Sequence, residues 1–302
     1  MIEYASNRVP LQMLSESDGV LAVIVETEGT SYRNVGTMMA FRADHRRVGS
    51  LSSGCIEDDI ADHAGTALAT GRARSLRYGL GSPFFDLKLP CGGGLSILLI
   101  PNPDRELLRQ ALALGTGRKS AFLSIGLTDG SLALLPSPTT NNGHLLVELE
   151  PELRFWVYGH GIEAIAFASM THAAGYDVTL FGQDSLQTDI SRLGALPIQT
   201  IASFRSYVCP TPDSRTAITL FFHDHENEAR LLAQFLPTEA FFIGAQGSLR
   251  ARTRLLDDLR ALNVTPEHLT RLCPTFGLIP SCRDPRTLAV SVMAHVLAIA
   301  AA

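Results

Sequence analysis

A glycine turn in the second half of the chain constrains the fold more than any other feature of the sequence. It lies between an apolar stretch at residues 155–158 and a helical pattern at 162–174, and a second expected strand follows at 177–181. A strand, a helix and a second strand in this order place the two strands parallel and side by side. The alternation then repeats, with expected strands at 217–222 and 240–243 and expected helices at 226–235 and 249–262. The pattern predicts a doubly wound parallel sheet.

The first half follows a different pattern. Apolar runs at residues 20–26 and 37–42 predict strands, and residues 55–70 carry apolar side chains at helical spacing. A chain of 302 residues is long enough for two domains, each with its own core. The fold class is therefore α/β, and we expect an N-terminal mixed α/β domain at residues 1–150 and a C-terminal Rossmann-like domain at 151–302.

The charge balance and the apolar segments exclude several classes of partner. The 25 Lys and Arg residues are outnumbered by 30 Asp and Glu, and a net charge of −5 gives no general attraction to nucleic acid. The longest nearly apolar stretch, 288–302, includes Ser291 and His295 and is shorter than the roughly 20 residues of a membrane span. The first residues lack the basic and apolar segments of a secretory signal. We expect a cytoplasmic protein that binds neither nucleic acid nor a membrane.

The glycine turn reads Gly159-His-Gly161-Ile-Glu-Ala164, a G-x-G-x-x-A fingerprint typical of dinucleotide-binding domains. Its glycines let the backbone approach a diphosphate, and the helix N-terminus supplies amide N–H groups and a partial positive charge. The alternative is a tight turn with no ligand. A nicotinamide cofactor also requires an acidic residue about 20 positions further on. Because Gly182 and Gln183 stand there, the sequence favours another phosphate-bearing ligand over NAD.

Two more loops are expected near this turn, because the carboxyl ends of parallel strands meet at one edge of the sheet. The loop at 223–225 contains two histidines and an aspartate, which can move a proton, bind a metal or simply hydrogen-bond at the surface. The loop at 244–250 is rich in glycine and enters a helix, so it is either an anion site or a strand exit with solvated arginines. The candidate binding residues in these loops are His223, Asp224, Gly244, Gly247, Ser248 and Arg250.

Two of the five cysteines lie in glycine-rich surroundings in the first half. Cys55 stands at the start of the expected helix, where the helix dipole favours a thiolate, whereas Glu57 and the two acids after it disfavour one. Cys91 precedes three glycines. Each cysteine is either a reactive thiol or a small buried residue at a crowded turn. Because the chain has an odd number of cysteines and no C-x-x-C pair, no metal site is predicted.

Six segments, taken in order along the chain, resemble the xanthine dehydrogenase accessory family, XdhC/CoxI: Thr27-Glu-Gly-Thr-Ser31, Gly49-Ser-Leu-Ser-Ser-Gly-Cys-Ile-Glu57, Cys91-Gly-Gly93, Tyr158-Gly-His-Gly161, Phe242-Ile-Gly-Ala-Gln-Gly-Ser248, and the tail from Gly277 to Ala294. The resemblance covers nearly the whole chain. It implies a cytoplasmic maturation factor, rather than a turnover enzyme, that binds the molybdenum cofactor (molybdopterin) and supports its sulfuration with a cysteine desulfurase. It also implies delivery of the cofactor to a molybdenum hydroxylase apoenzyme, and a homodimer.

The resemblance also assigns residues. The reactive positions that it implies are Cys55 and Glu57, and the implied cofactor-binding residues are Cys91, Gly159, Gly161, His223, Asp224, Gly244, Gly247 and Ser248. Arg250 joins them as a phosphate donor, because molybdopterin carries a phosphate, and a thiolate suits the soft coordination of its metal. The chain departs from the family pattern at Gly182, Gln183, Ile279 and His295. Two alternatives remain open: an NAD(P)-dependent oxidoreductase that uses the C-terminal domain, and a scaffold that binds only proteins.

Overall fold

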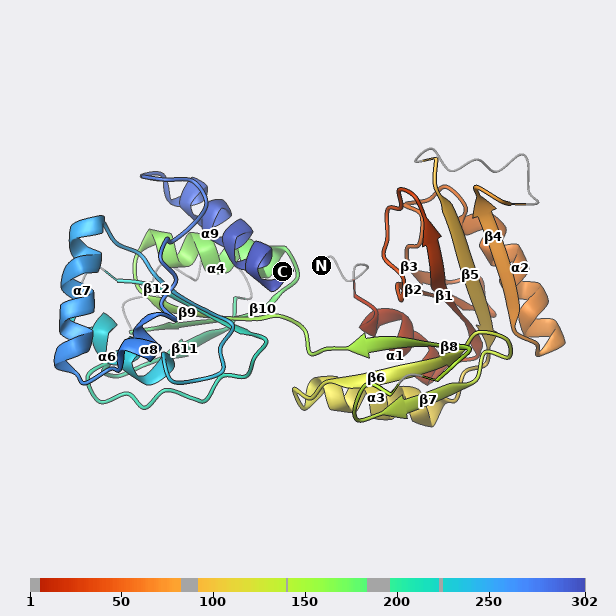
Figure 1. Cartoon of the computed structure of the whole chain (residues 1–302), viewed down its shortest axis with the longest axis horizontal. Coiled ribbons are helices and arrows are strands. Elements are labelled where there is room, and N and C mark those ends of the chain that lie inside the picture. Colours follow the sequence, from red (N-terminus) through yellow and green to blue (C-terminus); the bar gives the residue numbers. More distant parts are fainter. Residues whose placement is uncertain (1–5, 83–91, 140, 184–195, 223–224, 302) are drawn as a thin grey trace. The chain divides into compact units, whose positions relative to one another are not determined.

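The computed structural model of the chain, shown in Figure 1, describes residues 6–82, 92–139, 141–183, 196–222 and 225–301. Two compact units make up the chain, one extending to Pro151 and the other beginning at Glu152. The predicted fold class is confirmed: the first unit is mixed α/β, and the second is built on a parallel sheet with Rossmann-like topology. No helix in the described ranges is long and apolar enough to cross a membrane.

The N-terminal unit is built around a five-stranded sheet in which every neighbouring pair is antiparallel. Its order is β3-β2-β1-β5-β4, with bounds β1 Gly19–Glu28, β2 Met38–Arg42, β3 Arg47–Gly49, β4 Arg74–Gly79 and β5 Gly94–Pro101. The helix α2 (Glu57–Thr70) packs on one face of this sheet. Because the opposite face is also covered, the first six residues of β1 are all buried, which explains their uninterrupted apolar run.

The opposite face of that sheet packs against two helices and a second, smaller sheet. The helices are α1 (Arg8–Glu16) and α3 (Arg105–Thr116), and the antiparallel strands, in the order β7-β6-β8, are β6 Ala121–Gly126, β7 Leu132–Leu135 and β8 His144–Leu149. The N-terminus of α3 is capped by Asp104, whose side chain accepts the N–H groups of Glu106 and Leu107.

The C-terminal unit contains a five-stranded sheet in which all neighbouring pairs are parallel, as the sequence predicts. Its order is β11-β10-β9-β12-β13, with bounds β9 Arg154–Gly159, β10 Asp177–Gly182, β11 Ile198–Thr200, β12 Thr216–Phe221 and β13 Phe242–Ala245. The last strand begins two residues later than expected, because Arg271 binds the carbonyl oxygens of Thr238 and Ala240 and holds that stretch in a turn.

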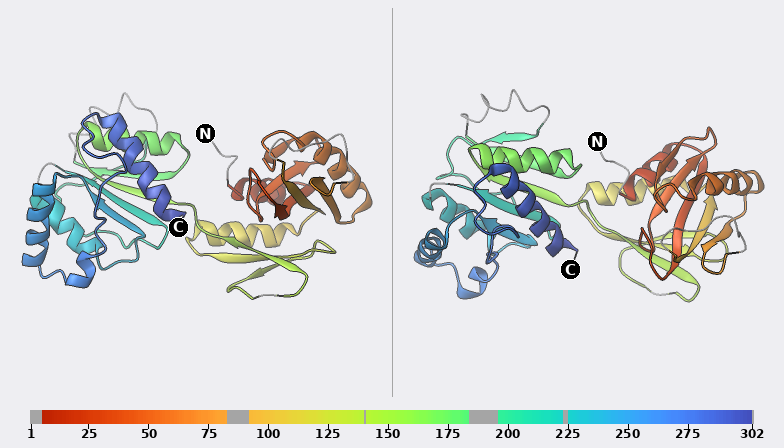
Figure 2. Two further views of the ribbon diagram at one scale, coloured as in Figure 1. Left: turned by 45° about the horizontal axis from the view of Figure 1, so that its top comes forward. Right: turned by 90° about the horizontal axis from the view of Figure 1, so that it is seen from above.

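Helices cover both faces of the parallel sheet (Figures 1 and 2). One face packs against α4 (Ile162–Ala173) and α9 (Pro285–Ala300), which lie side by side, and the other against α6 (His225–Phe235) and α7 (Leu249–Ala261). A short helix, α8 (Pro266–Leu269), follows α7. Helix α9 has a capped start: the Asp284 side chain accepts the N–H of Thr287, and Pro285 occupies the first helical position.

Candidate functional site

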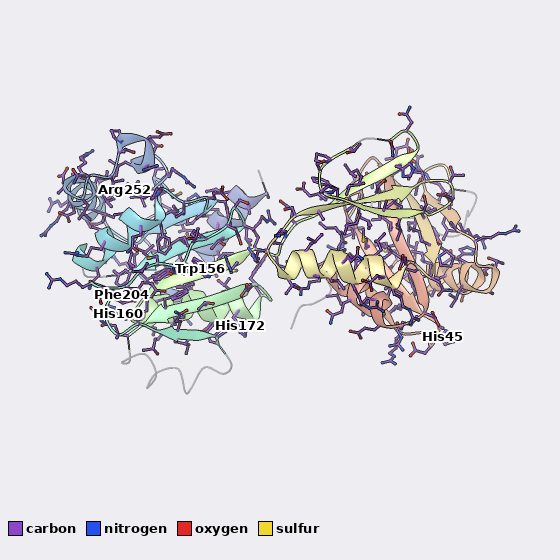
Figure 3. The ribbon with its side chains drawn as sticks, turned by 90° about the horizontal axis from the view of Figure 1, so that it is seen from below. His45, Trp156, His160, His172, Phe204 and Arg252 are labelled. Atoms are coloured by element: carbon purple, nitrogen blue, oxygen red, sulfur yellow. The ribbon has the colours of Figure 1, made fainter. Side chains whose placement is uncertain are left out.

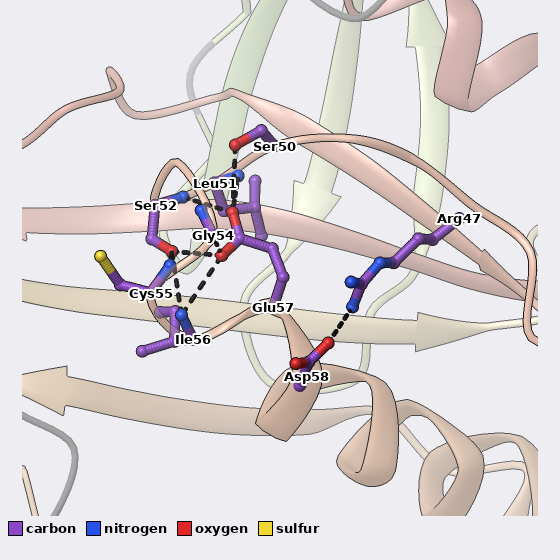
Figure 4. A network of polar contacts seen from close by, with 9 residues as sticks. All are labelled: Arg47, Ser50, Leu51, Ser52, Gly54, Cys55, Ile56, Glu57 and Asp58. Atoms are coloured by element: carbon purple, nitrogen blue, oxygen red, sulfur yellow. Dashed lines mark hydrogen bonds and ion pairs between the residues drawn. The ribbon is translucent and has the colours of Figure 1, made fainter.

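The loop before α2 is organised around the carboxylate of Glu57 (Figure 4). Its two oxygens accept backbone N–H groups from four loop residues, at 3.1 Å from Leu51, 2.9 Å from Ser52, 2.9 Å from Gly54 and 3.2 Å from Ile56. The hydroxyl groups of Ser50 (3.0 Å) and Ser52 donate to it as well. A carboxylate that accepts this many donors fixes the backbone of the loop in one conformation.

This environment keeps Glu57 ionised. Burial by itself raises the pKa of the Glu57 carboxyl, but hydrogen bonds from Ser52, Gly54 and Ser50 outweigh burial and lower the pKa to about 2. At neutral pH Glu57 therefore holds no proton to transfer, and its lone pairs already have donors. The structure gives Glu57 a positioning role in the loop that carries Cys55.

The thiol of Cys55 lies outside this network. Its backbone N–H donates to the Ser52 hydroxyl at 3.0 Å, whereas the side chain is exposed and the sulfur points away from the Glu57 carboxylate (Figure 4). The two residues before it have positive φ angles, 62° at Ser53 and 99° at Gly54. The loop thus presents a free cysteine on a rigid, tightly hydrogen-bonded turn.

Other glycine-rich loops share the sheet edge with the Cys55 loop. Because neighbouring strands are antiparallel, the ends of β1, β3 and β4 and the starts of β2 and β5 lie along one edge. Positive-φ glycines mark every connection there, at positions 29, 36, 49, 54, 79, 81 and 92. A side chain at Gly93 would overlap the carbonyl oxygens of Thr30 and Glu28, so the chain before β5 packs directly on the loop after β1. Cys91 lies outside the described residues.

The predicted glycine turn of the second unit follows β9. A Cβ at Gly159 would overlap the carbonyl group of Phe221 in β12, and Gly161 has a φ of 93°, which favours glycine. The His160 ring at this turn makes an edge contact with Phe222, and Phe222 makes another with Phe204 (Figure 3). These glycines are required by backbone packing, whether or not a ligand binds there.

A cavity of the second unit lies beside the N-terminus of α7 and has a volume of about 1020 Å³. Gly247 and Ser248 line it from the loop after β13, Arg252 lines it from α7, and residues 274–283 form another part of its wall. The Ser248 hydroxyl accepts the N–H of Ala251, while the other first-turn N–H groups of α7 have no partner within the helix. The cavity therefore combines a helix N-terminus with a guanidinium group, which suit an anion, and the buried Glu228 also lines it.

Only some of the predicted binding residues line this cavity. Gly247 and Ser248 do, whereas Gly159, Gly161, Gly244 and Arg250 do not. Gly244 is buried within β13, where a Cβ would lie 2.7 Å from the ring of Phe242 and 2.9 Å from that of Phe276, so it serves close packing. His223 and Asp224 lie outside the described residues.

Arg252 lines the cavity but was not among the predicted binding residues. Arg250 is exposed and does not line the cavity, whereas Arg252, labelled in Figure 3, lines it and donates to the carbonyl oxygens of Cys273 (2.8 Å) and Leu272 (3.2 Å). Burial lowers the pKa of the Arg252 guanidinium, and the nearby Cys273 opposes that shift. Residues 250 and 252 lie on different faces of α7, and the sequence alone does not show which face meets the cavity.

Potential metal ligands do not gather in the part of the chain that the structure describes: no group of three His, Cys, Asp or Glu side chains is placed to hold a metal ion. Together, the described features define a two-domain α/β protein, with an exposed cysteine on a rigid loop of the first unit and a cavity beside the N-terminus of α7 in the Rossmann-like second unit.

Comparison with known proteins identifies the family. Residues 14–79 match the model of the XdhC and CoxI family, and residues 155–296 match the model of the XdhC Rossmann domain. The chain is 33% identical over 290 residues to the molybdenum cofactor insertion chaperone PaoD of Escherichia coli (strain K12), covering 95% of this chain and 85% of PaoD. This protein therefore belongs to the XdhC and CoxI family.

More distant relatives agree with this assignment. A Bacillus subtilis (strain 168) protein, named as a probable xanthine dehydrogenase subunit, is 23% identical over 328 residues, with 93% of each chain covered. A crystal structure from Bacillus halodurans, described as a xanthine dehydrogenase, superposes with a TM-score of 0.79 at 22% identity and covers 98% of this chain and 96% of its own. That likeness shows that the fold is shared.

Proposed function

We propose that this protein binds the molybdenum cofactor and inserts it into a molybdenum hydroxylase apoenzyme of the xanthine dehydrogenase type. The observation that carries the proposal is the cavity beside α7, with its helix N-terminus and Arg252. Membership of the family and the 33% identity to a molybdenum cofactor insertion chaperone support it. Nothing observed favours NAD(P), since β10 ends at Gly182 and Gln183 follows it where a ribose-binding acid belongs.

The residues of the cavity fit the organic part of this cargo. Molybdopterin carries a phosphate, and the first-turn amides of α7 with the Arg252 guanidinium supply the N–H donors and positive charge that a phosphate needs. The rings of Phe222 and Phe276 line the same space and offer apolar faces for a pterin ring. A volume of about 1020 Å³ accommodates a ligand of this size.

The proposal gives Cys55 a part in the sulfuration of the cofactor, whose metal centre carries soft sulfur ligands. Cys55 is the exposed cysteine of the rigid loop, so its thiolate can attack the outer sulfur of a cysteine persulfide on the desulfurase. A new S–S bond then forms on Cys55 as the old one breaks, and the desulfurase cysteine leaves as a thiolate. We infer that the desulfurase and the apoenzyme are its protein partners, and that the protein acts as a cytoplasmic homodimer.

Cofactor retention tests the proposal. The protein is purified from a cofactor-producing host, and the pterin released by acid is oxidised and quantified by fluorescence. We expect stoichiometric pterin in the wild type and a loss of at least about tenfold in Arg252→Ala, because the variant removes both the charge proposed to meet the phosphate and the hydrogen bonds to Leu272 and Cys273 at the cavity wall. Arg250→Ala, an exposed arginine outside the cavity, is the matched control and should retain the wild-type content. Wild-type protein without pterin would overturn the proposal.

A further inference from the structure

One wall of the cavity has no regular secondary structure. Residues 273–279, the wall segment, lie outside every described helix and strand, yet residues 274–279 line the cavity. A segment of this kind keeps a fixed shape only if its backbone N–H and C=O groups find partners elsewhere. In this protein, side chains from two helices provide several of those partners.

Helix α9 holds the C-terminal end of the wall segment through two side chains four residues apart. The N–H of Gly277 donates to Nδ1 of His295 at 3.3 Å, and the N–H of Ile279 donates to the Ser291 hydroxyl at 2.7 Å. The N–H of Leu278 donates to the Ser291 carbonyl at 3.3 Å. Positions i and i+4 share one face of a helix, so this face of α9 supports three consecutive residues of the wall.

The wall segment rests directly on α9 at Gly277. This glycine has a φ of 99°, and a Cβ there would lie 2.5 Å from the Ser291 hydroxyl oxygen. From the other side, Arg252 of α7 binds the carbonyl oxygens of Leu272 and Cys273. The segment is therefore held at both ends, and its position depends on α7 and α9 together.

The contacts of His295 define its tautomer. A backbone N–H can only donate, so Nδ1 accepts from Gly277 and carries no proton, which places the ring proton on Nε2. Nε2 lies 3.8 Å from the sulfur of Cys273, and the ring meets Phe242 at 84° with a centroid distance of 5.6 Å. The ring is thus oriented by β13 and by both ends of the wall segment.

We propose that His295 and Ser291 are positioning residues, which hold residues 277–279 in place and thereby set the affinity of the cavity for its cargo. This inference rests on the proposed function of the cavity. A wall that is already in its bound position spares the ligand the free energy of ordering it, so a looser wall lowers affinity without removing a ligand contact.

Two replacements of His295 test whether the acceptor at Nδ1 is what holds the wall. In His295→Asn the amide oxygen takes the place of Nδ1 and still accepts from Gly277, whereas in His295→Leu no acceptor remains. Hydrogen exchange measured by mass spectrometry on peptides that contain residues 277–279 reports the wall without any ligand. We expect faster exchange in His295→Leu and Ser291→Ala and near wild-type exchange in His295→Asn.

Pterin retention on the same proteins completes the test. We expect a fall of about tenfold in cofactor affinity for His295→Leu, with recovery in His295→Asn, the effect of losing one hydrogen bond that orders the wall. Equal losses in the Asn and Leu variants, or unchanged retention where exchange is faster, would overturn the inference. A wild-type protein with no pterin would instead overturn the proposed function. The exchange data would still report whether His295 and Ser291 hold residues 277–279 in place.

Discussion

Ser52 donates two hydrogen bonds to Glu57, one from its backbone N–H at 2.9 Å and one from its hydroxyl, and the same hydroxyl accepts the N–H groups of Cys55 and Ile56. One serine thus links the carboxylate to the residue that carries the exposed thiol. Because both side chains are buried, their hydrogen bonds are shielded from water and hold the loop firmly. The chemistry proposed for Cys55 depends on this support.

Ionisation of the Glu57 carboxylate should make the free energy of unfolding depend on pH. Its pKa is about 2 in the folded protein and about 4.3 in an unfolded chain, so the folded state favours the ionised form. The stabilisation is fully present above the pKa of Glu57 in the unfolded chain and is lost as the pH falls through its pKa in the folded protein. The free energy of unfolding should therefore fall by about 3 kcal/mol between pH 6 and pH 2. Urea unfolding at a series of pH values measures it.

Glu57→Gln should remove this component of the pH dependence and lower the free energy of unfolding at pH 7 by about 3 kcal/mol. Asp62→Asn, on the exposed side of the same helix, is the control and should change stability by less than about 0.5 kcal/mol. If the two variants lose the same stability, the network around Glu57 does not hold the loop.

Two of the cysteines should differ in their rate of alkylation. Cys55 is exposed, whereas burial raises the pKa of the Cys209 thiol to about 12. Because the thiolate is the reactive form, iodoacetamide at pH 7.5 should modify Cys55 at least about tenfold faster than Cys209 in the folded protein. Mass spectrometry of a time course measures both rates, and urea-unfolded protein, in which the rates should converge, is the control. Equal rates in the folded state would contradict the structure.

The sequence predicted the second unit well because its strands and helices are covered on both sides and alternate regularly. Residues 155–158 are a continuous apolar run and residues 217–222 are apolar apart from Thr219, the pattern of parallel strands buried on both faces. The turn at Gly159 was predictable too, since glycine is needed where β9 approaches the carbonyl of Phe221.

The first unit was predicted less completely. The strands β4 and β5 and the small sheet β6–β8 were not predicted. In particular, β4 is a short edge strand that includes Arg74 and Arg77, and it is a strand because it pairs with β5 rather than because of its composition. Glu57 was chosen for its carboxylate, but the hydrogen bonds that assign its positioning role come from a backbone conformation that spacing alone does not reveal. The same limit explains why Arg250 was chosen in place of Arg252.

Replacing Gly159 should destabilise the fold far more than replacing a glycine in an open loop. In Gly159→Ala the new Cβ overlaps the carbonyl oxygen of Phe221 and lies 2.8 Å from its carbonyl carbon, so β9 and β12 must separate. We expect a loss of about 3 kcal/mol or more. Gly54→Ala has open space around its Cβ but a φ of 99°, so it should cost about 1–2 kcal/mol. Urea unfolding compares the two, and the opposite order would contradict the packing described at the turn.

An aspartate at the N-cap of α7 should separate cargo binding from helix stability. Aspartate caps a helix as well as serine does, so Ser248→Asp should preserve the bond to the Ala251 N–H and leave the free energy of unfolding within about 0.5 kcal/mol of the wild type. It also places a negative charge where the phosphate is proposed to bind, so pterin retention should fall by tenfold or more. Thr265→Asp makes the same change at the cap of α8, away from the cavity, and should leave retention unchanged. Retention that is equal in both variants would show that the phosphate binds elsewhere.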